Sequence, residues 1–491
     1  MSGMAVTAEV VEAQAAARLV SPGFERWAEQ AASCGHCANP VRLRGSATTL
    51  DRATGELVSS YDSAREPDGV LYVRCGNRRA SVCPSCSHEY KGDMWHLLAA
   101  GAAGGMKGVP SSVASHPLVF ATLTAPSFGP VHTTRRSGRC RPRRRREVCE
   151  HERPLGCDAA HEDGDPLLGQ PICPECYDYT GHVVWQWWAP ELWRRFTIAL
   201  RRGLAARLGV SQKEAHELVR VSFAKVAEFQ RRAVVHFHAL IRLDGPPTDD
   251  EPYPAPLVPV AAGELALLVR EAAARVWFDA PPVGEGGEAR RLRFGVQVDA
   301  RPVTSSAHRE LGRADEGEGL HPETVAAYIA KYATKACEDF GLPPRLRHPE
   351  AARRLGVNEH VCRLLEEVHC LAGVEDGPYL ALVKWVPMLG FRGHFATKSR
   401  RYSTTLGQLR TARRRWSVQR LRDRMTGRTT DVDPAALDEE GEDSTLVVGS
   451  WSLDGFGWLT AGDAALAATA AAQARKWADE RARSRRAAAA A

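Results

Sequence analysis

The sequence predicts an α+β protein built on a ferredoxin-like (split βαβ) core with an antiparallel sheet. Strand-like and helix-like segments alternate between residues 117 and 339 in the order β-α-β-β-α-β-α, which is that arrangement with one added helix. The chain also has thirteen cysteines, ten of them before residue 177. This concentration predicts a zinc-binding N-terminal module and a second zinc-binding region within an insertion in the core.

Four segments form the first half of the predicted core. Residues 117–125 (PLVFATLTA) are apolar and β-branched, which predicts a buried strand. Apolar residues at helical spacing predict a helix over residues 191–208. Residues 219–229 and 233–243 follow as two strands joined by a short turn.

Three further segments complete the core. Residues 264–276 predict a helix, residues 293–303 a strand and residues 322–339 a second helix.

An acidic stretch with Pro and Gly at residues 431–443 predicts a disordered linker. The Ala-rich residues 461–491 then predict a lone terminal helix.

A length of 491 residues suggests about three domains of roughly 150 residues each. The N-terminal residues lack the basic and apolar regions of a signal peptide, and no run approaches the roughly 18 to 20 apolar residues of a membrane span. We therefore expect a cytoplasmic protein without a membrane partner, in which paired cysteines hold metal rather than form disulfides. The expected parts are a Cys-rich zinc module at 1–110, the core at 111–340 with a basic and Cys/His-rich insertion at 133–182, a basic region at 341–430, and the acidic linker and Ala-rich helix at 431–491.

The first cysteine cluster has two Cys-x-x-Cys pairs separated by a loop, which is the spacing of a tetrahedral zinc site. Buried apolar cysteines are the alternative. The predicted ligands are Cys34, Cys37, Cys83 and Cys86, with Cys75 as a spare or substitute ligand.

The second cluster contains one firm pair, Cys173 and Cys176, and spacing alone does not select its partners. The candidates are Cys149, His151, Cys157 and His161. We take Cys157 and His161 as the working choice. The cysteines expected to have no metal-binding role are Cys140, Cys337, Cys362 and Cys370.

Between the clusters, eight arginines fall within twelve residues at 135–146. The net charge of the whole chain is only +6, so this is a local concentration. No compact core buries so much charge, and such a run is typical of a solvated loop that attracts nucleic acid without reading its sequence. The arginines expected to contact nucleic acid are Arg135, Arg136, Arg143, Arg144, Arg145 and Arg146.

A His-x-His pair lies in the predicted strand 233–243. Side chains alternate across a strand, so His236 and His238 share one face. The preceding strand offers Glu228 and Gln230 in the same alternation, and we favour Glu228 because a carboxylate suits Mg²⁺ or Mn²⁺. The alternative is a pair of hydrogen-bonded structural histidines.

The predicted helix 322–339 carries two tyrosines four residues apart. Tyr328 and Tyr332 therefore share a face, and Lys331 and Lys335 form an adjacent stripe. Aromatic packing of an amphipathic helix is the alternative for the tyrosines.

Taken together, the FATLT strand, the His-Phe-His pair and the Tyr-x-x-x-Tyr-x-x-Lys helix resemble the three motifs of the HUH endonucleases. Over about residues 34 to 410, the chain resembles RepSA-type replication initiators of actinobacterial plasmids and integrative elements. The segments that carry this resemblance are CPSCSHEYKGD, FATLTAPSFGPVH, CYDYTGHVVWQWWAPELWRRF, KVAEFQRRAVVHFHALIRLDG, YIAKYATKA and GFRGHFATKSRRYSTTL.

The resemblance implies a DNA nicking-closing enzyme that starts rolling-circle replication. A divalent metal on the histidines and Glu228 aligns the scissile phosphate. Attack by Tyr332 or Tyr328 leaves a 5′-phosphotyrosine and a 3′-OH primer, and Lys335 and Lys331 stabilise the phosphate charge. One-tyrosine relatives have a glutamate at the position of Tyr328, so the chain follows the two-tyrosine pattern.

The implied partners are double-strand origin DNA, single-stranded DNA, a host helicase and a DNA polymerase. Arg392 and Lys398 lie in a basic segment at 390–401 that is expected near DNA, with a solvated surface turn as the alternative. A cluster of tryptophans at residues 185–193 is expected to pack a helix against the sheet, with stacking on bases as the alternative. Its members are Trp185, Trp187, Trp188 and Trp193.

Two other functions compete with this interpretation. A two-tyrosine HUH transposase needs the same residues, whereas a relaxase usually has its catalytic tyrosine near the N-terminus. A non-enzymatic, zinc-dependent DNA-binding regulator accounts for the cysteines and arginines but leaves the histidines and tyrosines without a role.

Overall fold

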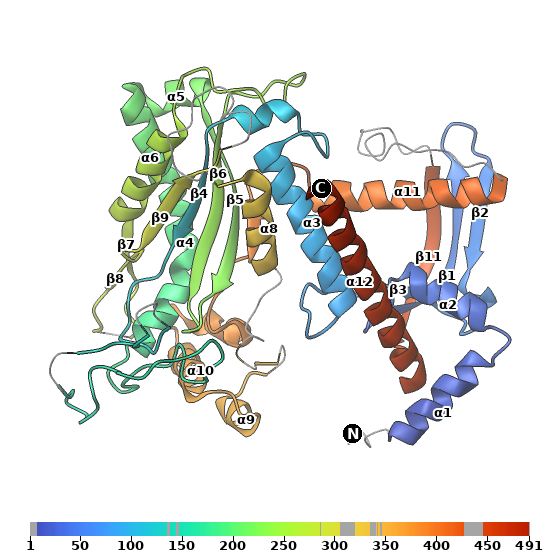
Figure 1. The fold of residues 1–491 in the computed structure, drawn as a ribbon, viewed down its shortest axis with the longest axis horizontal. Coiled ribbons are helices and arrows are strands. Elements are labelled where there is room, and N and C mark those ends of the chain that lie inside the picture. The colour runs from blue at the N-terminus through green and yellow to red at the C-terminus, as the bar shows by residue number, and fades with distance from the viewer. Residues whose placement is uncertain are drawn as a thin grey trace. The chain divides into compact units, whose positions relative to one another are not determined.

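In the computed structural model, the chain folds into two compact units. Unit 1 comprises Met1–Asp93 and Glu439–Ala491, and unit 2 comprises Met94–Asp438. Figure 1 shows the elements of both units. The structure describes residues 7–134, 138–143, 147–284, 286–304, 320–333, 340, 342–343, 346–426 and 445–490.

Unit 1 combines the two ends of the chain in one antiparallel sheet. Strand β1 pairs with β11, β2 and β3. The strands are β1 (Val41–Asp51), β2 (Leu57–Asp62), β3 (Leu71–Val73) and β11 (Thr445–Phe456). The helices are α1 (Ala8–Leu19), α2 (Phe24–Ser33), η1 (Ser63–Arg65), the start of α3 (Pro84–Ala103) and α12 (Ala461–Ala490).

The C-terminal segment is part of a folded unit, and the expectation of a lone helix was wrong. Strand β11 pairs with β1 over its whole length, from Phe456 opposite Val41 to Thr445 opposite Asp51. Helix α12 contacts α1, where Arg18 Nε donates to Asp463 Oδ1 at 2.6 Å. The expected acidic linker at 431–443 lies outside the described residues.

Unit 2 contains a five-stranded antiparallel sheet with the order β10-β5-β6-β4-β9. Strand β6 therefore lies between β4 and β5, the two strands that precede it in the chain. The bounds are β4 (Leu118–Leu123), β5 (Arg220–Phe229), β6 (Val235–Asp244), β9 (Val298–Pro302) and β10 (Ala396–Lys398). The predicted α+β class with an antiparallel sheet is confirmed.

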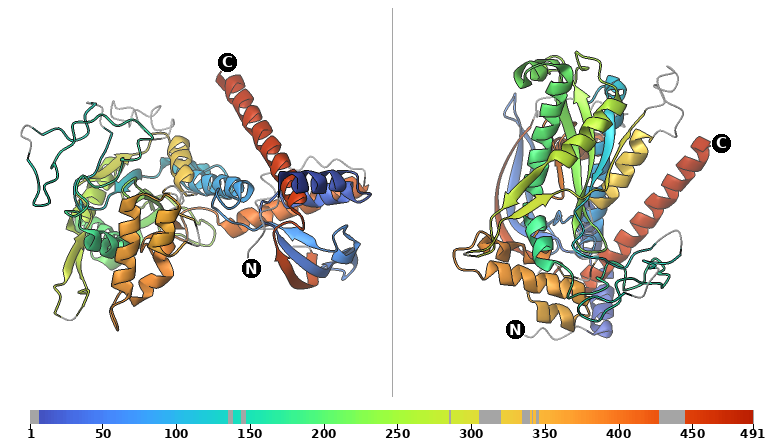
Figure 2. Two further views of the ribbon diagram at one scale, coloured as in Figure 1. Left: turned by 90° about the horizontal axis from the view of Figure 1, so that it is seen from below. Right: turned by 90° about the vertical axis from the view of Figure 1, so that its left-hand side faces the viewer.

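Helices cover both faces of this sheet. Helices α4 (Tyr179–Leu208) and α6 (Ala262–Arg275) lie on one face and α8 (Pro322–Tyr332) on the other (Figure 2). On the first face, Phe237 of β6 packs against Trp193 of α4, with ring centroids 5.8 Å apart. On the opposite face, the next residue, His238, lies 5.5 Å from the ring of Tyr328 on α8. The alternation along β6 thus separates an apolar core from a polar site.

The remaining elements of unit 2 surround this core. Helix α10 packs on α4, and β7 pairs with β8 as a separate hairpin. These elements are the rest of α3, η2 (Ser111–Ser115), α5 (Gln212–Leu218), β7 (Trp277–Ala280), β8 (Arg290–Arg293), α9 (Pro349–Arg354), α10 (Glu359–Ala372), η4 (Leu380–Met388) and α11 (Leu406–Thr426).

Two elements differ in extent from their predictions. Helix α4 begins at Tyr179 rather than at residue 191, because the Asp178 carboxylate caps it by accepting from Gly181 N at 2.8 Å. The segment 293–303 is not one strand, since Arg293 ends β8 and only Val298–Pro302 joins the main sheet. The predicted helix 322–339 is described as far as Tyr332.

Candidate active site

The hairpin of β5 and β6 brings the predicted carboxylate and histidines together. Glu228 is the cross-strand partner of His236, and Val226 is the partner of His238. The turn is closed by Ala233 N, which donates to Gln230 O at 2.8 Å, and Ala233 adopts a φ of 61°. Gln230 therefore lies in the turn, and Glu228 is the residue that faces the histidines.

The three side chains meet at one oxygen atom. Glu228 Oε2 lies 2.8 Å from His236 Nε2 and 3.0 Å from His238 Nε2. Adjacent ligands on an octahedral ion with bonds of about 2.1 Å are about 3.0 Å apart. The two nitrogens and the oxygen therefore fit a small divalent cation such as Mg²⁺ or Mn²⁺.

The protonation states suit such a cation. Burial opposes ionisation of Glu228, but hydrogen bonds with His236 and His238 outweigh it and lower the pKa of the carboxyl to about 2. Burial also lowers the pKa of His238, against the opposing influence of Glu228. A carboxylate and a neutral imidazole are therefore present at neutral pH.

Both predicted tyrosines lie at this site. The Tyr332 ring stacks on His238 at 5.4 Å with an interplanar angle of 27°, and the Tyr328 ring lies 4.8 Å from that of Tyr332. Tyr328 is 44% exposed. Burial and a hydrogen bond with Tyr328 raise the pKa of Tyr332, so its hydroxyl is protonated at neutral pH and needs a partner for activation.

Strand β4 supplies contacts to His238 that were not expected from the sequence. Thr122 is the cross-strand partner of His238, and its Oγ1 lies 3.0 Å from His238 Nδ1. Phe120 stacks on the same imidazole at 5.7 Å. The alternation of the FATLT strand already placed Phe120 and Thr122 on one face, which was the available signal.

Buried polar side chains of α4 and α10 contact the carbonyl groups of the β5–β6 turn, and these contacts were not predicted from the sequence. His182 Nε2 lies 3.2 Å from Ala233 O, and Gln186 Nε2 donates to the same oxygen at 3.1 Å. His360 Nε2 lies 3.0 Å from Arg232 O. Because this turn sets the register of Glu228 against His236, these side chains support the site.

The predicted basic residues are only partly described. Lys331 is an exposed residue of α8, and the exposed Arg143 pairs with Glu147 at 3.0 Å. The other residues of this group lie outside the described part of the chain. They are Lys335, Arg135, Arg136, Arg144, Arg145 and Arg146.

Arg392 and Lys398, the residues of segment 390–401 expected near DNA, both make contacts within unit 2. The Arg392 guanidinium lies 4.4 Å from the Trp187 ring, and its Nε donates to Trp187 O at 3.0 Å. Lys398 Nζ donates to Ser403 O at 2.9 Å, and burial lowers its pKa to about 8. Both cations are engaged within unit 2.

The expected packing role of the tryptophans is confirmed, since Trp185 and Trp187 are buried in the core.

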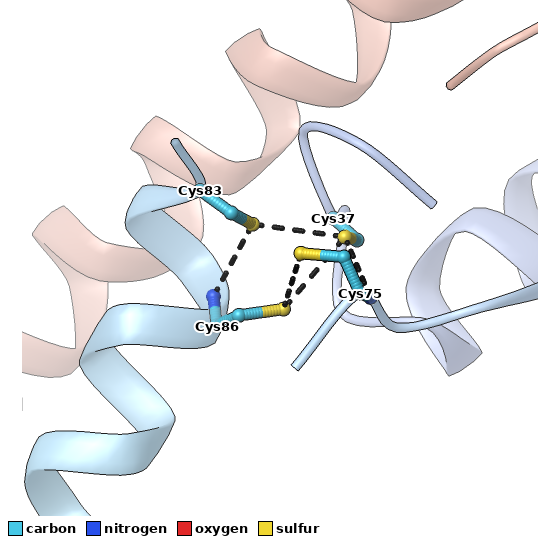
Figure 3. Close-up of side chains that lie close together, drawn as sticks. All are labelled: Cys37, Cys75, Cys83 and Cys86. Carbon is cyan, nitrogen blue, oxygen red and sulfur yellow. Dashed lines mark hydrogen bonds between the residues drawn. The ribbon is translucent and has the colours of Figure 1, made fainter. Parts of the chain in front are cut away.

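The first cysteine cluster has the geometry of a zinc site (Figure 3). Cys37 Sγ lies 3.6 Å from Cys83 Sγ, and Cys86 Sγ lies 3.7 Å from both Cys37 and Cys75. Four thiolates at about 2.3 Å from a tetrahedral zinc ion are about 3.7 Å apart, whereas disulfide sulfurs are about 2.05 Å apart. Cys37, Cys75, Cys83 and Cys86 can therefore bind zinc.

Cys34 is not in this set, which corrects the predicted ligands. Cys34 is the C-cap residue that follows α2, and its Sγ donates to Ala31 O at 3.3 Å. The following residues Gly35 and His36 have φ values of 61° and 50°, and this turn directs the chain so that Cys37 reaches the cluster. Cys75, which had been considered a substitute, takes the fourth position.

The second region contains two sets of ligands instead of one. Cys173 and Cys176 lie with Cys149 and His151, and Cys149 Sγ is 3.6 Å from Cys173 Sγ. The working choice of Cys157 and His161 as their partners was wrong. Those two residues lie with two that were not predicted as ligands, His132 and Cys140. Cys337 lies outside the described residues.

The fold and these sites define a mixed α+β protein with antiparallel sheets and Cys/His clusters that can bind zinc. Within the described part of the chain, no helix is long and apolar enough to span a membrane.

Comparison with known proteins gives the family. The RepSA family model, described as "Replication initiator protein, pSAM2", matches residues 23–472. A replication initiator protein of Streptomyces ambofaciens is 42% identical over 457 residues, which cover 92% of this chain and 90% of the relative. The chain therefore belongs to the RepSA family of replication initiator proteins, as its motifs had indicated. No solved structure matches the chain.

Proposed function

We propose that this replication initiator nicks one DNA strand at the double-strand origin of a plasmid or integrative element by tyrosine attack. The product is a 5′-phosphotyrosine and a free 3′-OH that primes rolling-circle replication. The observation that carries the proposal is the convergence of Tyr328 and Tyr332 on the cluster of Glu228, His236 and His238. The position of β6 between β4 and β5 supports an HUH-type core.

Glu228, His236 and His238 would hold the catalytic Mg²⁺ or Mn²⁺. When bound there, such a cation withdraws charge from the non-bridging oxygens of the scissile phosphate. The ionised Glu228 lowers the net charge of the occupied site. The Thr122 contact fixes the His238 ring, so that Nε2 faces the cluster.

The tyrosine supplies the nucleophile for a transesterification. The phenolic oxygen forms a bond to phosphorus, the bond from phosphorus to the 3′-oxygen breaks, and the departing oxygen gains a proton as the phenol loses one. Because the raised pKa of Tyr332 keeps its hydroxyl protonated, proton loss accompanies the attack. Whichever of Tyr328 and Tyr332 makes the first cut, the other lies one helical turn away and makes the second cut after replication, and the stored phosphotyrosine bond permits rejoining.

Other parts of the chain serve DNA binding and stability. Lys331 and Lys335 stabilise the phosphate charge during transfer, and the arginine-rich segment attracts origin duplex and single-stranded DNA. Structural zinc is held by the clusters that contain Cys37 and Cys149. A host helicase and a DNA polymerase then extend the primer. Membership in the RepSA family favours replication over transposition as the biological outcome.

The test is nicking of supercoiled plasmid DNA that carries the origin region, with the full-length protein and Mn²⁺. We expect nicked circles and a covalent protein–DNA adduct, both abolished in the double variant Tyr328→Phe/Tyr332→Phe. Tyr253→Phe, which removes a phenol hydroxyl elsewhere in unit 2, is the matched control and retains both products. An adduct that persists in the double variant contradicts the tyrosine assignment, and nicking that survives chelation of metal contradicts the metal site.

A further inference from the structure

His132, Cys140, Cys157 and His161 form a cluster in unit 2 that the proposed catalytic chemistry does not use. One ligand atom from each residue lies within 4.8 Å of all the others. We infer that these residues bind a zinc ion in a Cys₂His₂ site, separate from the neighbouring Cys149, His151, Cys173 and Cys176 cluster. Unit 2 then holds two structural zinc ions in the segment between β4 and α4.

The distances fit a tetrahedral ion. His132 Nδ1 and His161 Nε2 are 3.1 Å apart, and Cys157 Sγ is 3.5 Å from His161 Nε2. Zinc bonds of about 2.0–2.1 Å to nitrogen and about 2.3 Å to sulfur give edges of about 3.3 Å and about 3.5 Å. Cys140 Sγ, 4.0 Å from His132 Nδ1, is the farthest of these contacts. A modest approach of Cys140 completes the tetrahedron.

The ligands also have the supporting contacts that metal sites require. Asp165 Oδ2 lies 2.6 Å from His161 Nδ1, on the side of the ring opposite the cluster, and Asp165 Oδ1 accepts from Leu167 N at 2.8 Å. A carboxylate behind a histidine fixes the tautomer and raises the basicity of the coordinating nitrogen. Thr133 N donates to Cys140 Sγ at 3.2 Å, which stabilises a thiolate.

The surrounding chain needs such a cross-link. Among its described residues, the segment 124–178 contains isolated bridges and turns but no helix or strand. One bridge joins Arg141 to Cys157, with N–H···O distances of 2.7 and 3.0 Å. A long segment without regular structure buries little apolar surface, and metal ions commonly stabilise such segments.

The ligands of the two clusters also flank the arginine-rich sequence. In the sequence, His132 precedes the eight arginines, Cys140 divides them and Cys149 follows them. The two zinc ions would therefore bind the chain before, within and after this sequence. Arg141, next to Cys140, also lines a groove of about 750 Å³ together with Arg231, Arg232 and Arg293. The suggested use of this surface for DNA phosphates rests on the proposed function, whereas the zinc site does not.

Zinc content of the full-length protein tests the site directly. After purification with a mild chelator, we expect three zinc ions per chain, one for each Cys/His cluster, and two in Cys140→Ser. Cys362→Ser, which changes a buried cysteine outside the clusters, is the matched control and keeps three. Two zinc ions in the unchanged protein, with no loss in Cys140→Ser, overturn the proposal.

Cobalt substitution separates ligand loss from misfolding. In the His132→Cys variant we expect the cobalt ion to be retained with one more thiolate ligand, so that the thiolate-to-cobalt absorption increases. An unchanged spectrum of this variant overturns the assignment. This result is decisive even where Cys140→Ser misfolds and loses more than one ion. Asp165→Asn is expected to weaken zinc binding about 10- to 100-fold in competition with a chromophoric chelator. Asp163→Asn is its control, because Asp163 pairs with Arg231 instead. These readouts do not depend on DNA cleavage, so failure of the nicking proposal leaves them interpretable.

Discussion

His238 is held on several sides by contacts that fix its orientation. Thr122 Oγ1 faces one ring nitrogen at 3.0 Å and Glu228 Oε2 faces the other at 3.0 Å, while Phe120 and Tyr332 stack on the ring. If Nδ1 carries the proton and donates to Thr122, the lone pair of Nε2 points to the cluster. Thr122 is therefore a positioning residue, acting through His238.

Replacement of Thr122 tests this role, which rests on the proposed metal site. Thr122→Val removes the acceptor and keeps the branched shape, so we expect about 10- to 100-fold weaker Mn²⁺ binding by calorimetry. Thr122→Ser keeps the hydroxyl and is expected to restore most of the affinity. Equal affinity in the Val and Ser variants contradicts a role for the hydroxyl.

Lys225 is a buried cation on the apolar face of β5. Its Nζ lies 4.5 Å from the Phe237 ring, and burial lowers its pKa from 10.5 to about 7. Between these two values the unfolded chain binds the proton more strongly, so stability rises with pH from about 7 to 10.5. The lysine thus destabilises the fold near neutral pH, although its contact with Phe237 offsets part of the cost.

Lys225→Met is expected to stabilise unit 2 by on the order of a few kcal/mol at pH 7 and by less at pH 10. Urea unfolding followed by tryptophan fluorescence at both pH values provides the measurement. Lys213→Met, at an exposed position, is the control and changes little. Destabilisation by Lys225→Met at both pH values contradicts this account.

At the residue scale, the candidate site residues that could be predicted to lie together are those on regular elements. Strand alternation and the chemistry of a carboxylate favoured Glu228 with His236 and His238, and helical spacing placed Tyr328 and Tyr332 on one face. The zinc ligands were less predictable, because Cys75, His132 and Cys140 lie in irregular segments. There the distance between ligands depends on turns, such as the positive φ values of Gly35 and His36, that have no periodic signal.

The β5–β6 hairpin is the element on which the site depends. Its turn carbonyls are bound by His182, Gln186 and His360 from α4 and α10. Burial lowers the pKa of His182 well below 6.5 and that of His360 to about 4. Both rings are neutral in the folded protein at neutral pH, so each has one nitrogen that donates to the turn.

This arrangement predicts a loss of stability in acid. Between pH 6.5 and about 4, His360 is protonated in the unfolded chain but neutral in the folded protein. Its contribution to the free energy of unfolding is therefore complete above pH 6.5 and falls by about 3 kcal/mol as the pH decreases towards 4. His360→Gln keeps a donor that does not titrate. We expect a shallower decline of the urea midpoint between pH 6.5 and 4 than in the unchanged protein, and an identical decline contradicts the assignment.

The elements of the core were more predictable than their ends. Apolar periodicity located α4, α6, β5 and β6, because these segments bury one or both faces. The first three turns of α4, which contain Pro190, were missed because apolar residues at helical spacing were recognised only from residue 191, although tryptophans of these turns pack in the core. Strand β10 has three residues, Ala396–Lys398, too few for an alternating pattern to be recognised.

At the scale of the molecule, unit 1 requires both ends of the chain. Trp458, which follows β11, is buried against Tyr72 with ring centroids 4.6 Å apart, and its Nε1 donates to Cys37 O at 2.9 Å. The C-terminal segment thus supports the backbone of a predicted zinc ligand. The pairing of β1 with β11 was not predicted, because local periodicity carries no information on a contact across about 400 residues.

Removal of the C-terminal segment tests this dependence. In a chain that ends at residue 438, we expect limited proteolysis to cut within residues 1–93 and the zinc content to fall by one ion, because β1 loses β11 and Cys37 loses Trp458. A chain that ends at residue 484 keeps β11 and most of α12 and is the control. Equal protease resistance of the two shortened chains contradicts a structural role for β11.

The pairing of β1 with β11 also sets an order for folding during synthesis. Residues 94–444, which separate the first part of unit 1 from β11, take roughly 20–70 s to translate at about 5–20 residues per second. Unit 2 can fold within that interval, while one edge of β1 stays unpaired and open to association with other chains. Unit 1 closes only after β11 has been synthesised, so its closure distinguishes chains that contain β11 from chains that terminate before it.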